Sequence, residues 1–243
     1  MNKLFKKFKN KNILITGGAG FIGSSLAYVL VKLSAKVTVL DAMLPLYGDN
    51  IFNLQEIKNK IKFIKGDTRD KKLISQLIKD KDIIYNLAAQ VSYLDSKDSP
   101  LLDLEINGLA HLNLLEAARY HNPKVKILFS SSRLVYGKIL TKPVREPHPT
   151  NPLSIYGIHK LLAEKYYAYY HQAFGLDTVS VRIPNPYGPR QQMKHNKYSI
   201  VGLFIRQALE NKTIKIFGGG SQERDYIYID DIVDAFLRLS LGG

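Results

Sequence analysis

The chain has 243 residues, of which 45% are hydrophobic, no cysteine, and a net charge of +14. This length and composition indicate a globular protein of one or two domains, and they exclude disulfides, thiolate metal sites and cysteine nucleophiles. No apolar run is long enough to cross a bilayer, and the basic start lacks the apolar segment of a secretory signal. We therefore expect a cytoplasmic protein with no membrane partner.

The positive charges do not gather in one part of the sequence. Stretches such as KNKIKF and IKDKD spread lysines along the chain, often beside acidic residues. We interpret the charge as a general bias of composition rather than a nucleic-acid footprint, and we expect no nucleic-acid partner. The positive field would still attract anionic substrates such as nucleotide diphosphates.

Short apolar strands alternate with amphipathic helices along the chain. Such strands, apolar on both faces, predict a parallel sheet covered on both sides, which is an α/β fold of the doubly wound, Rossmann-like kind. Gly175 is the expected C-cap of the last helix. The strands are expected at 12–18, 36–42, 60–67, 82–89, 124–132 and 177–188, and the helices at 20–33, 71–80, 100–121 and 155–175.

A glycine turn, TGGAGFIG, connects the first strand to the first helix. Glycine at Gly17, Gly20 and Gly23 would let the backbone approach a pyrophosphate held on free helix N–H groups. Asp41 ends the second strand, where a carboxylate can bind ribose hydroxyls and repel a 2′-phosphate, so NAD is favoured over NADP. The alternative is a plain turn followed by a solvated aspartate.

Residues at the ends of the next two strands extend this cofactor site. Asp67 and Thr68 are candidates for the adenine edge, with a turn role as the alternative for Asp67, and the small residues of NLAA suit a backbone lying against a cofactor. The predicted cofactor-binding residues are Gly17, Gly20, Phe21, Ile22, Gly23, Asp41, Asp67, Thr68, Leu87, Ala88, Ala89, Tyr156 and Lys160.

Tyr156 and Lys160 are four residues apart on a predicted helix, so their side chains share one face. An ammonium near a phenol, together with the positive ring of oxidised NAD, would lower the tyrosine pKa. Such a tyrosine can take a proton from an alcohol, and Ser132 would hold the same oxygen by a hydrogen bond. We expect a catalytic set of Ser132, Tyr156 and Lys160, and no metal.

Seven motifs in a fixed order carry a family resemblance: ITGGAGFIGSSL, GD at 66–67, NLAAQ, SSSRLVYG, YGIHK, PNPYGPRQ and RDYIYIDD. Together they resemble the extended short-chain dehydrogenase/reductases, in particular the NAD-dependent nucleotide-sugar epimerase/dehydratase family. The resemblance implies an NAD-binding Rossmann domain at 1–183 and a smaller nucleotide-sugar-binding domain at 184–243, which looks truncated beside the family's usual length. It assigns Ser132, Tyr156 and Lys160 to catalysis, and Ser132, Asn185 and Arg224 to the substrate. For Arg224 the alternative is a surface ion pair with the neighbouring Glu223 or Asp225.

The residues after Ser132 bear on the reaction. In the dehydratase branch, the place of Ser132-Arg133-Leu134 looks like Thr-Asp-Glu, whose two acids drive loss of water from a 4-keto sugar. Leu134 cannot transfer a proton, so the resemblance favours a 4-epimerase for UDP-glucose/galactose-type sugars, in which hydride leaves C4 to NAD and returns to the other face of a transient 4-keto sugar. A dTDP-glucose 4,6-dehydratase-like enzyme and a non-catalytic NAD-binding protein are the alternatives.

The oligomeric state stays open at this point. The helix at 155–175 carries tyrosines on more than one face, and the family commonly pairs this helix and its 101–121 neighbour in a homodimer. The same tyrosines could equally cover the substrate domain or loops.

Overall fold

The core of the protein is one parallel sheet. The computed structural model describes residues 3–45, 47, 50–194, 197, 199–216 and 218–242. The strands lie in the order β3-β2-β1-β4-β5-β6, and every neighbouring pair is parallel. This order is that of a doubly wound Rossmann sheet, so the predicted fold class is confirmed. The strands are β1 (Asn12–Thr16), β2 (Lys36–Asp41), β3 (Ile61–Lys65), β4 (Ile83–Asn86), β5 (Lys126–Ser132) and β6 (Asp177–Ile183).

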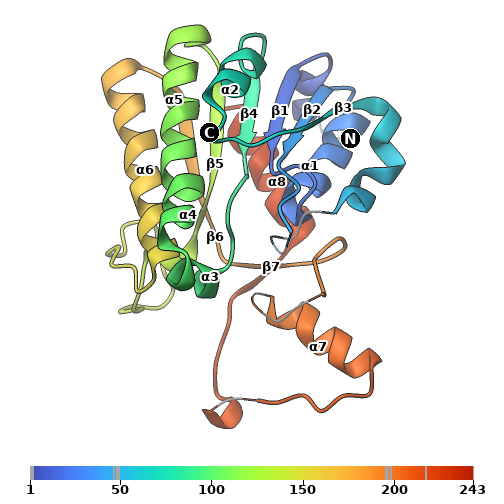
Figure 1. The fold of residues 1–243 in the computed structure, drawn as a ribbon, viewed down its shortest axis with the longest axis vertical. Helices are drawn as coiled ribbons and strands as arrows, with labels where there is room; N and C mark the ends of the chain where they lie inside the picture. The colour runs from blue at the N-terminus through green and yellow to red at the C-terminus, as the bar shows by residue number, and fades with distance from the viewer. Residues whose placement is uncertain are drawn as a thin grey trace.

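Helices cover both faces of this sheet (Figure 1). Successive side chains of a strand point to opposite faces, and in β1 Ile13 and Ile15 pack in one core cluster while Leu14 packs in the other. The strands are therefore apolar on both sides, as their sequences indicate. The first cluster includes α1 (Phe21–Lys32) and α8 (Ile229–Ser240), and the second includes α2 (Lys71–Leu77), α5 (Ala110–His121) and α6 (Ile155–Phe174).

The remaining elements are short and mostly lie in the connections. The helix predicted at 100–121 is interrupted by a π-helical turn, and Gly175 caps α6 with a φ of 69°, as predicted. These elements are η1 (Lys3–Phe8), η2 (Ile51–Lys60), α3 (Tyr93–Asp98), α4 (Pro100–Leu104), η3 (Glu105–Leu109), η4 (Arg133–Val135), β7 (Asn185–Tyr187), α7 (Ile200–Leu209), η5 (Gly218–Gly220) and β8 (Tyr226–Tyr228).

Helix α8 returns from the later part of the chain to the sheet. Strands β7 and β8 pair with each other in parallel, and α8 then packs beside α1. The hydroxyls of Tyr85 on β4 and Ser240 are 2.7 Å apart, and Phe236 packs edge-on against the Tyr85 ring. Residues from 229 onward thus complete the core around the parallel sheet. The domain boundary expected after residue 183 stays a prediction.

The strand order reverses between β1 and β4, so the loops after these two strands diverge. Ligands of doubly wound sheets bind in the crevice that forms at such a point, outside the carboxyl ends of the strands. These ends lie along the lower edge of the sheet in Figure 1, with β7 and α7 beneath them. Within the described ranges, no helix combines the length and the apolar character needed to cross a membrane.

Candidate active site

A cavity of about 640 Å³ opens at the carboxyl ends of the strands. Its volume falls in the range of about 300–1,000 Å³ that is usual for small-molecule sites. Every residue predicted for the site from the sequence lines this cavity. They are Gly17, Gly20, Phe21, Ile22, Gly23, Asp41, Asp67, Thr68, Leu87, Ala88, Ala89, Ser132, Tyr156, Lys160, Asn185 and Arg224.

The glycine turn forms a close backbone cradle at one end of the cavity. Gly17 has a φ of +66°, and a Cβ placed on it would lie 2.8 Å from backbone atoms of Ala88. A Cβ on Gly23 would lie 2.4 Å from the carbonyl oxygen of Gly17. Helix α1 begins just after Gly20 with no side-chain cap, so its first amides can hold an anion. The turn therefore fits the pyrophosphate of a dinucleotide.

Asp41 is fixed at the end of β2 by two backbone amides. The N–H of Ala19 donates to Oδ2 and the N–H of Met43 donates to Oδ1, each at 2.9 Å. The side chain is 8% exposed, yet it lines the cavity. A carboxylate oriented in this way beside the glycine turn fits the adenosine ribose of NAD.

Asp67, at the edge of the same cavity, is held by an arginine. Its carboxylate lies 2.7 Å from the Arg69 guanidinium, which also reaches Glu105 at 2.8 Å. Burial would raise the pKa of Asp67, but hydrogen bonds from Arg69 outweigh this effect and hold the pKa below its ordinary value. The carboxylate is thus already engaged by Arg69, and its place at the adenine edge stays a prediction, as does that of Thr68.

A buried polar network fixes the loop after β4. The hydroxyl of Thr16 donates to Asn86 Oδ1 at 2.5 Å and accepts from the amides of Leu87 and Ala88, each at 3.1 Å. Asn86 Nδ2 in turn donates to the Tyr167 hydroxyl at 2.7 Å. These bonds join β1, β4 and α6 directly behind the cradle.

Ser132, Tyr156 and Lys160 meet where β5 ends and α6 begins. The Ser132 hydroxyl accepts from the amide of Leu134 at 3.2 Å and is hydrogen-bonded to Tyr156. Lys160 is 2% exposed, and its Nζ donates to the carbonyl of Ser130 at 3.0 Å. The Nζ lies 5.8 Å from the centre of the Tyr156 ring. The three predicted side chains therefore share one corner of the cavity.

The pKa shift of Tyr156 differs in direction from the expectation. Burial raises the pKa of Tyr156, although the Ser132 hydrogen bond and the charge of Arg133 act in the opposite direction. Burial also lowers the pKa of Lys160 to about 8. We expected Lys160 to lower the tyrosine pKa, but in the protein alone desolvation dominates both groups. A bound cofactor cation would be needed to favour the phenolate.

Sequence reasoning missed a buried carboxylate behind this pair. Asp103 is fully buried, accepts from His159 Nδ1 at 2.6 Å and from Asn107 Nδ2 at 3.1 Å, and raises the pKa of both Tyr156 and Lys160. An acid in the otherwise apolar PLLDL segment was the available signal.

The wall of the cavity next to this corner carries Arg133, Asn185 and Arg224. Asn185 Nδ2 donates to the carbonyl of Asp225 at 2.8 Å, and its Oδ1 accepts from Arg133 Nε at 3.1 Å. Glu223 pairs with Lys142 at 2.6 Å, and Arg224 Nη1 donates to the backbone carbonyl of Glu223 at 2.8 Å. Both Arg133 and Arg224 line the cavity.

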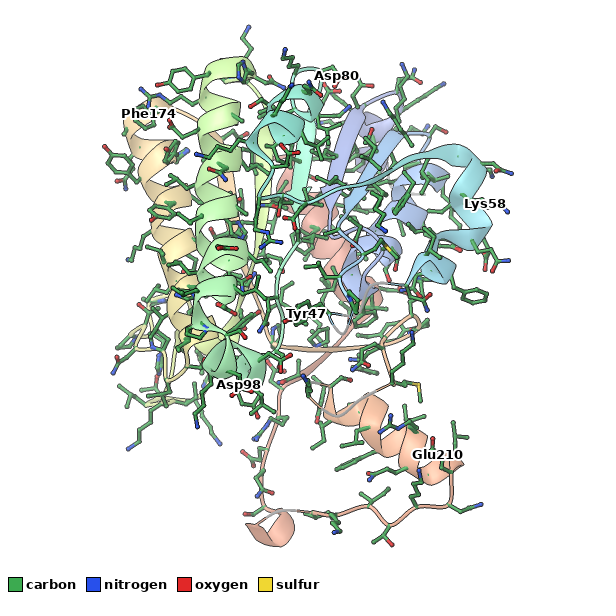
Figure 2. All side chains as sticks on the ribbon, viewed as in Figure 1. Tyr47, Lys58, Asp80, Asp98, Phe174 and Glu210 are labelled. Atoms are coloured by element: carbon green, nitrogen blue, oxygen red, sulfur yellow. The ribbon has the colours of Figure 1, made fainter. Side chains whose placement is uncertain are left out.

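Residues of α7 and the loops around it complete the lining. The sequence did not predict that these residues line the cavity, because the position of α7 depends on the path of the loop before it. Tyr47 also lines the cavity and lies at the edge of the sheet that faces α7 (Figure 2). The unpredicted lining residues from this region are Gln191, Gln192, Lys197, Ser199, Ile200, Val201 and Leu203.

A Rossmann sheet with a glycine cradle and an adjoining serine–tyrosine–lysine corner defines an enzyme that uses a dinucleotide cofactor. The sequence pattern of the NAD dependent epimerase/dehydratase family matches residues 13–241. The chain belongs to this family, and its cofactor is NAD, which the cradle and Asp41 fit.

The similar proteins include both reaction types of the family. The UDP-glucose 4-epimerase of Mycolicibacterium smegmatis is 37% identical over 93% of this chain and 72% of its own length. A UDP-N-acetylglucosamine 4-epimerase from Methanobrevibacter ruminantium, solved with UDP-N-acetylmuramic acid, is 34% identical with a TM-score of 0.89, over 96% of this chain and 73% of its own. The dTDP-glucose 4,6-dehydratase DesIV from Streptomyces venezuelae, solved with NAD, is 28% identical with a TM-score of 0.88, over 96% and 72%.

Proposed function

We propose that this protein is a nucleotide-sugar 4-epimerase that acts on a UDP-sugar through a transient 4-keto sugar. The epimerases among its relatives, which are named for UDP-sugars, support the substrate class. The neighbouring dehydratase has a nearly equal TM-score, so overall similarity does not separate the two reactions. The chemistry of the cavity lining favours one of them.

The observation that carries this proposal is the distribution of acids around the cavity. Among the described lining residues, the carboxylates are Asp41, which ends β2, and Asp67, which lies just after β3. The corner with Ser132 and Tyr156 has Arg133 and Leu134 in their place, and Asp103 behind it is buried and bonded to His159. Loss of water from a sugar needs a proton acceptor and a proton donor at adjacent carbons. This corner offers neither beyond the tyrosine itself.

The side chains present suffice for epimerisation. Tyr156 would accept the proton of the C4 hydroxyl, and Ser132 would hold that oxygen by a hydrogen bond. Lys160, fixed on the Ser130 carbonyl, would keep a positive charge beside the phenol. When bound, NAD supplies reversible oxidation at C4. Tyr156 would return the proton after the sugar has turned its other face to the cofactor.

The test is incubation of the purified chain and NAD with UDP-glucose, UDP-galactose and dTDP-glucose separately, followed by NMR of the products. We expect inversion at C4 with water retained, and Tyr156→Phe should reduce the rate by at least about 100-fold because the proton acceptor is lost. Tyr169→Phe is the matched control, because Tyr169 lies on the exposed side of α6.

Two other results would replace the proposal. A 4-keto-6-deoxy product would show a dehydratase and refute the argument from the missing carboxylates. NAD binding without turnover of any nucleotide sugar would favour a non-catalytic NAD-binding protein.

A homodimer also stays a proposal. Tyr167 and Tyr170 are buried against α5, so most of the expected tyrosine surface belongs to the core of one chain. Leu101, Leu109 and Tyr120 on neighbouring segments, and Tyr169 on α6, nevertheless remain 47–75% exposed. Sedimentation equilibrium should give twice the 27.5 kDa chain mass. A single-chain mass throughout the concentration range would refute it.

A further inference from the structure

Arg133 is held in the cavity wall by one side of its guanidinium. Strand β5 ends at Ser132, and the turn η4 directs the next side chain toward Asn185, whose Oδ1 accepts from Arg133 Nε at 3.1 Å. Asn185 is itself anchored by the carbonyl of Asp225. Within the described part of the chain, neither Nη atom of Arg133 has a hydrogen-bond partner. The outer fork of the guanidinium is therefore available to a ligand.

Among the described lining residues, no carboxylate lies near this fork to balance its charge. The acids of the described lining are Asp41, at the end of β2, and Asp67, just after β3. Strands lie about 4.8 Å apart, so β2 is about 14 Å from β5 across the sheet. Arg224 is close enough to Arg133 to lower its pKa, in addition to the larger effect of partial burial. Two guanidinium groups that line the same cavity favour a bound anion over a neutral molecule.

The position of Arg133 indicates which part of a substrate it would meet. It follows Ser132 directly in the sequence, and its charge lowers the pKa of Tyr156. The phenol must meet the C4 hydroxyl in the proposed reaction, so Arg133 lies beside the sugar ring. Arg224 comes later in the sequence than Asn185 and lies just before β8. It is placed to bind the diphosphate, which every nucleotide sugar carries. A neutral hexose would leave the Arg133 fork facing hydroxyls only.

We propose that the sugar of the substrate carries a carboxylate, and that Arg133 selects it through a two-pronged hydrogen bond. The inference rests on the proposed nucleotide-sugar function and narrows its substrate class to UDP-sugar acids. Carboxylate and guanidinium match in planar geometry, and such charge-assisted pairs are the strong ones in proteins. The carboxylate could belong to C6 of a hexuronate or to a lactyl ether on the ring.

The experiment measures both binding and turnover with the NAD-loaded chain. The probes are UDP, UDP-glucose, UDP-glucuronate and UDP-N-acetylmuramate, with affinity from calorimetry and C4 inversion from NMR. We expect one of the two acid sugars to bind and turn over about 10- to 100-fold better than UDP-glucose. A preference for UDP-glucuronate would place the carboxylate at C6, and a preference for UDP-N-acetylmuramate would place it on the lactyl ether.

Substitution of Arg133 assigns the preference to this residue. Arg133→Met keeps the apolar stem and should remove the preference for the acid sugar, while affinity for UDP changes less than about threefold. Arg133→Lys should keep part of the preference for the acid sugar, because the ammonium retains the positive charge but cannot form the two-pronged hydrogen bond. Arg145→Met removes the same charge from an exposed loop outside the cavity and should change none of these values.

Three results would decide against the inference or separate it from the function. Better binding of UDP-glucose than of both acid sugars would overturn the inference and leave the epimerase proposal standing. An equal loss of UDP affinity in Arg133→Met would also overturn it, because Arg133 would then bind the diphosphate. Arg133-dependent binding of an acid sugar without turnover would support the inference and refute the epimerase.

Discussion

Lys160 shows how a single residue can serve chemistry at a cost in stability. Its ammonium is buried against the Ser130 carbonyl and the Phe129 ring, and burial lowers its pKa from 10.5 to about 8. The neighbouring charges of Asp103 and Glu164 offset only part of this desolvation. A proton-transfer site benefits from a group that titrates close to neutral pH.

This shift predicts a pH-dependent stability. Between about pH 8 and 10.5 the unfolded chain binds the Lys160 proton while the folded chain releases it, so the free energy of unfolding should rise with pH in this window. Buried tyrosines with raised pKa values act in the opposite direction near pH 10. The quantity to measure is therefore the difference between the wild type and Lys160→Met in urea unfolding.

We expect the wild type to gain stability relative to Lys160→Met as the pH rises from about 7 to 10. Lys165→Met, on the exposed side of α6, should follow the wild type at each pH. A constant difference between the wild type and Lys160→Met would show that the buried ammonium is not destabilised.

At the scale of elements, helix α8 is the segment whose packing most directly joins distant parts of the chain. Its apolar face, with Ile232, Val233, Phe236 and Leu237, is almost completely buried against α1 and the sheet. Its other face carries the Asp234–Arg238 pair in solvent. The core cluster on this side of the sheet therefore depends on a helix far along the sequence.

Phe236→Ala should lower the free energy of unfolding by about 3–5 kcal/mol, because the ring is fully buried and contacts Tyr85. Arg238→Ala on the same helix removes an exposed ion pair with Asp234 and a contact over the Phe5 ring, and its cost should stay below about 1 kcal/mol. Urea unfolding measures both. Equal small losses in the two variants would mean that α8 contributes little to the folded core.

At the scale of the whole molecule, the sequence predicted those features of the fold and the site that local patterns determine. Six apolar runs gave six strands, and the glycine turn and the Tyr156–Lys160 spacing placed the cofactor cradle and the catalytic corner in one cavity. The π turn at Glu105–Leu109, the Asp103–His159 pair and the α7 wall were not predicted. The α7 wall and the pairing of Asp103 with His159 depend on contacts between segments distant in the chain, although the acid in PLLDL was itself a local signal.

Arg133 illustrates the same limit at the functional site. The sequence shows only that an acid is missing after Ser132. Its bond to Asn185, which lies 52 positions later, and the nearby Arg224 give the guanidinium a direction and a role.

The bond between Tyr85 and Ser240 joins residues 155 positions apart. During synthesis on the ribosome, all six strands exist before α8 has been made, so one face of the sheet then exposes Tyr85 and Leu128 to solvent. Contacts of such long sequence separation slow folding, and an uncovered apolar sheet face favours association with other chains. The nascent protein would thus depend on chaperones most strongly in the interval before residues 229–240 emerge.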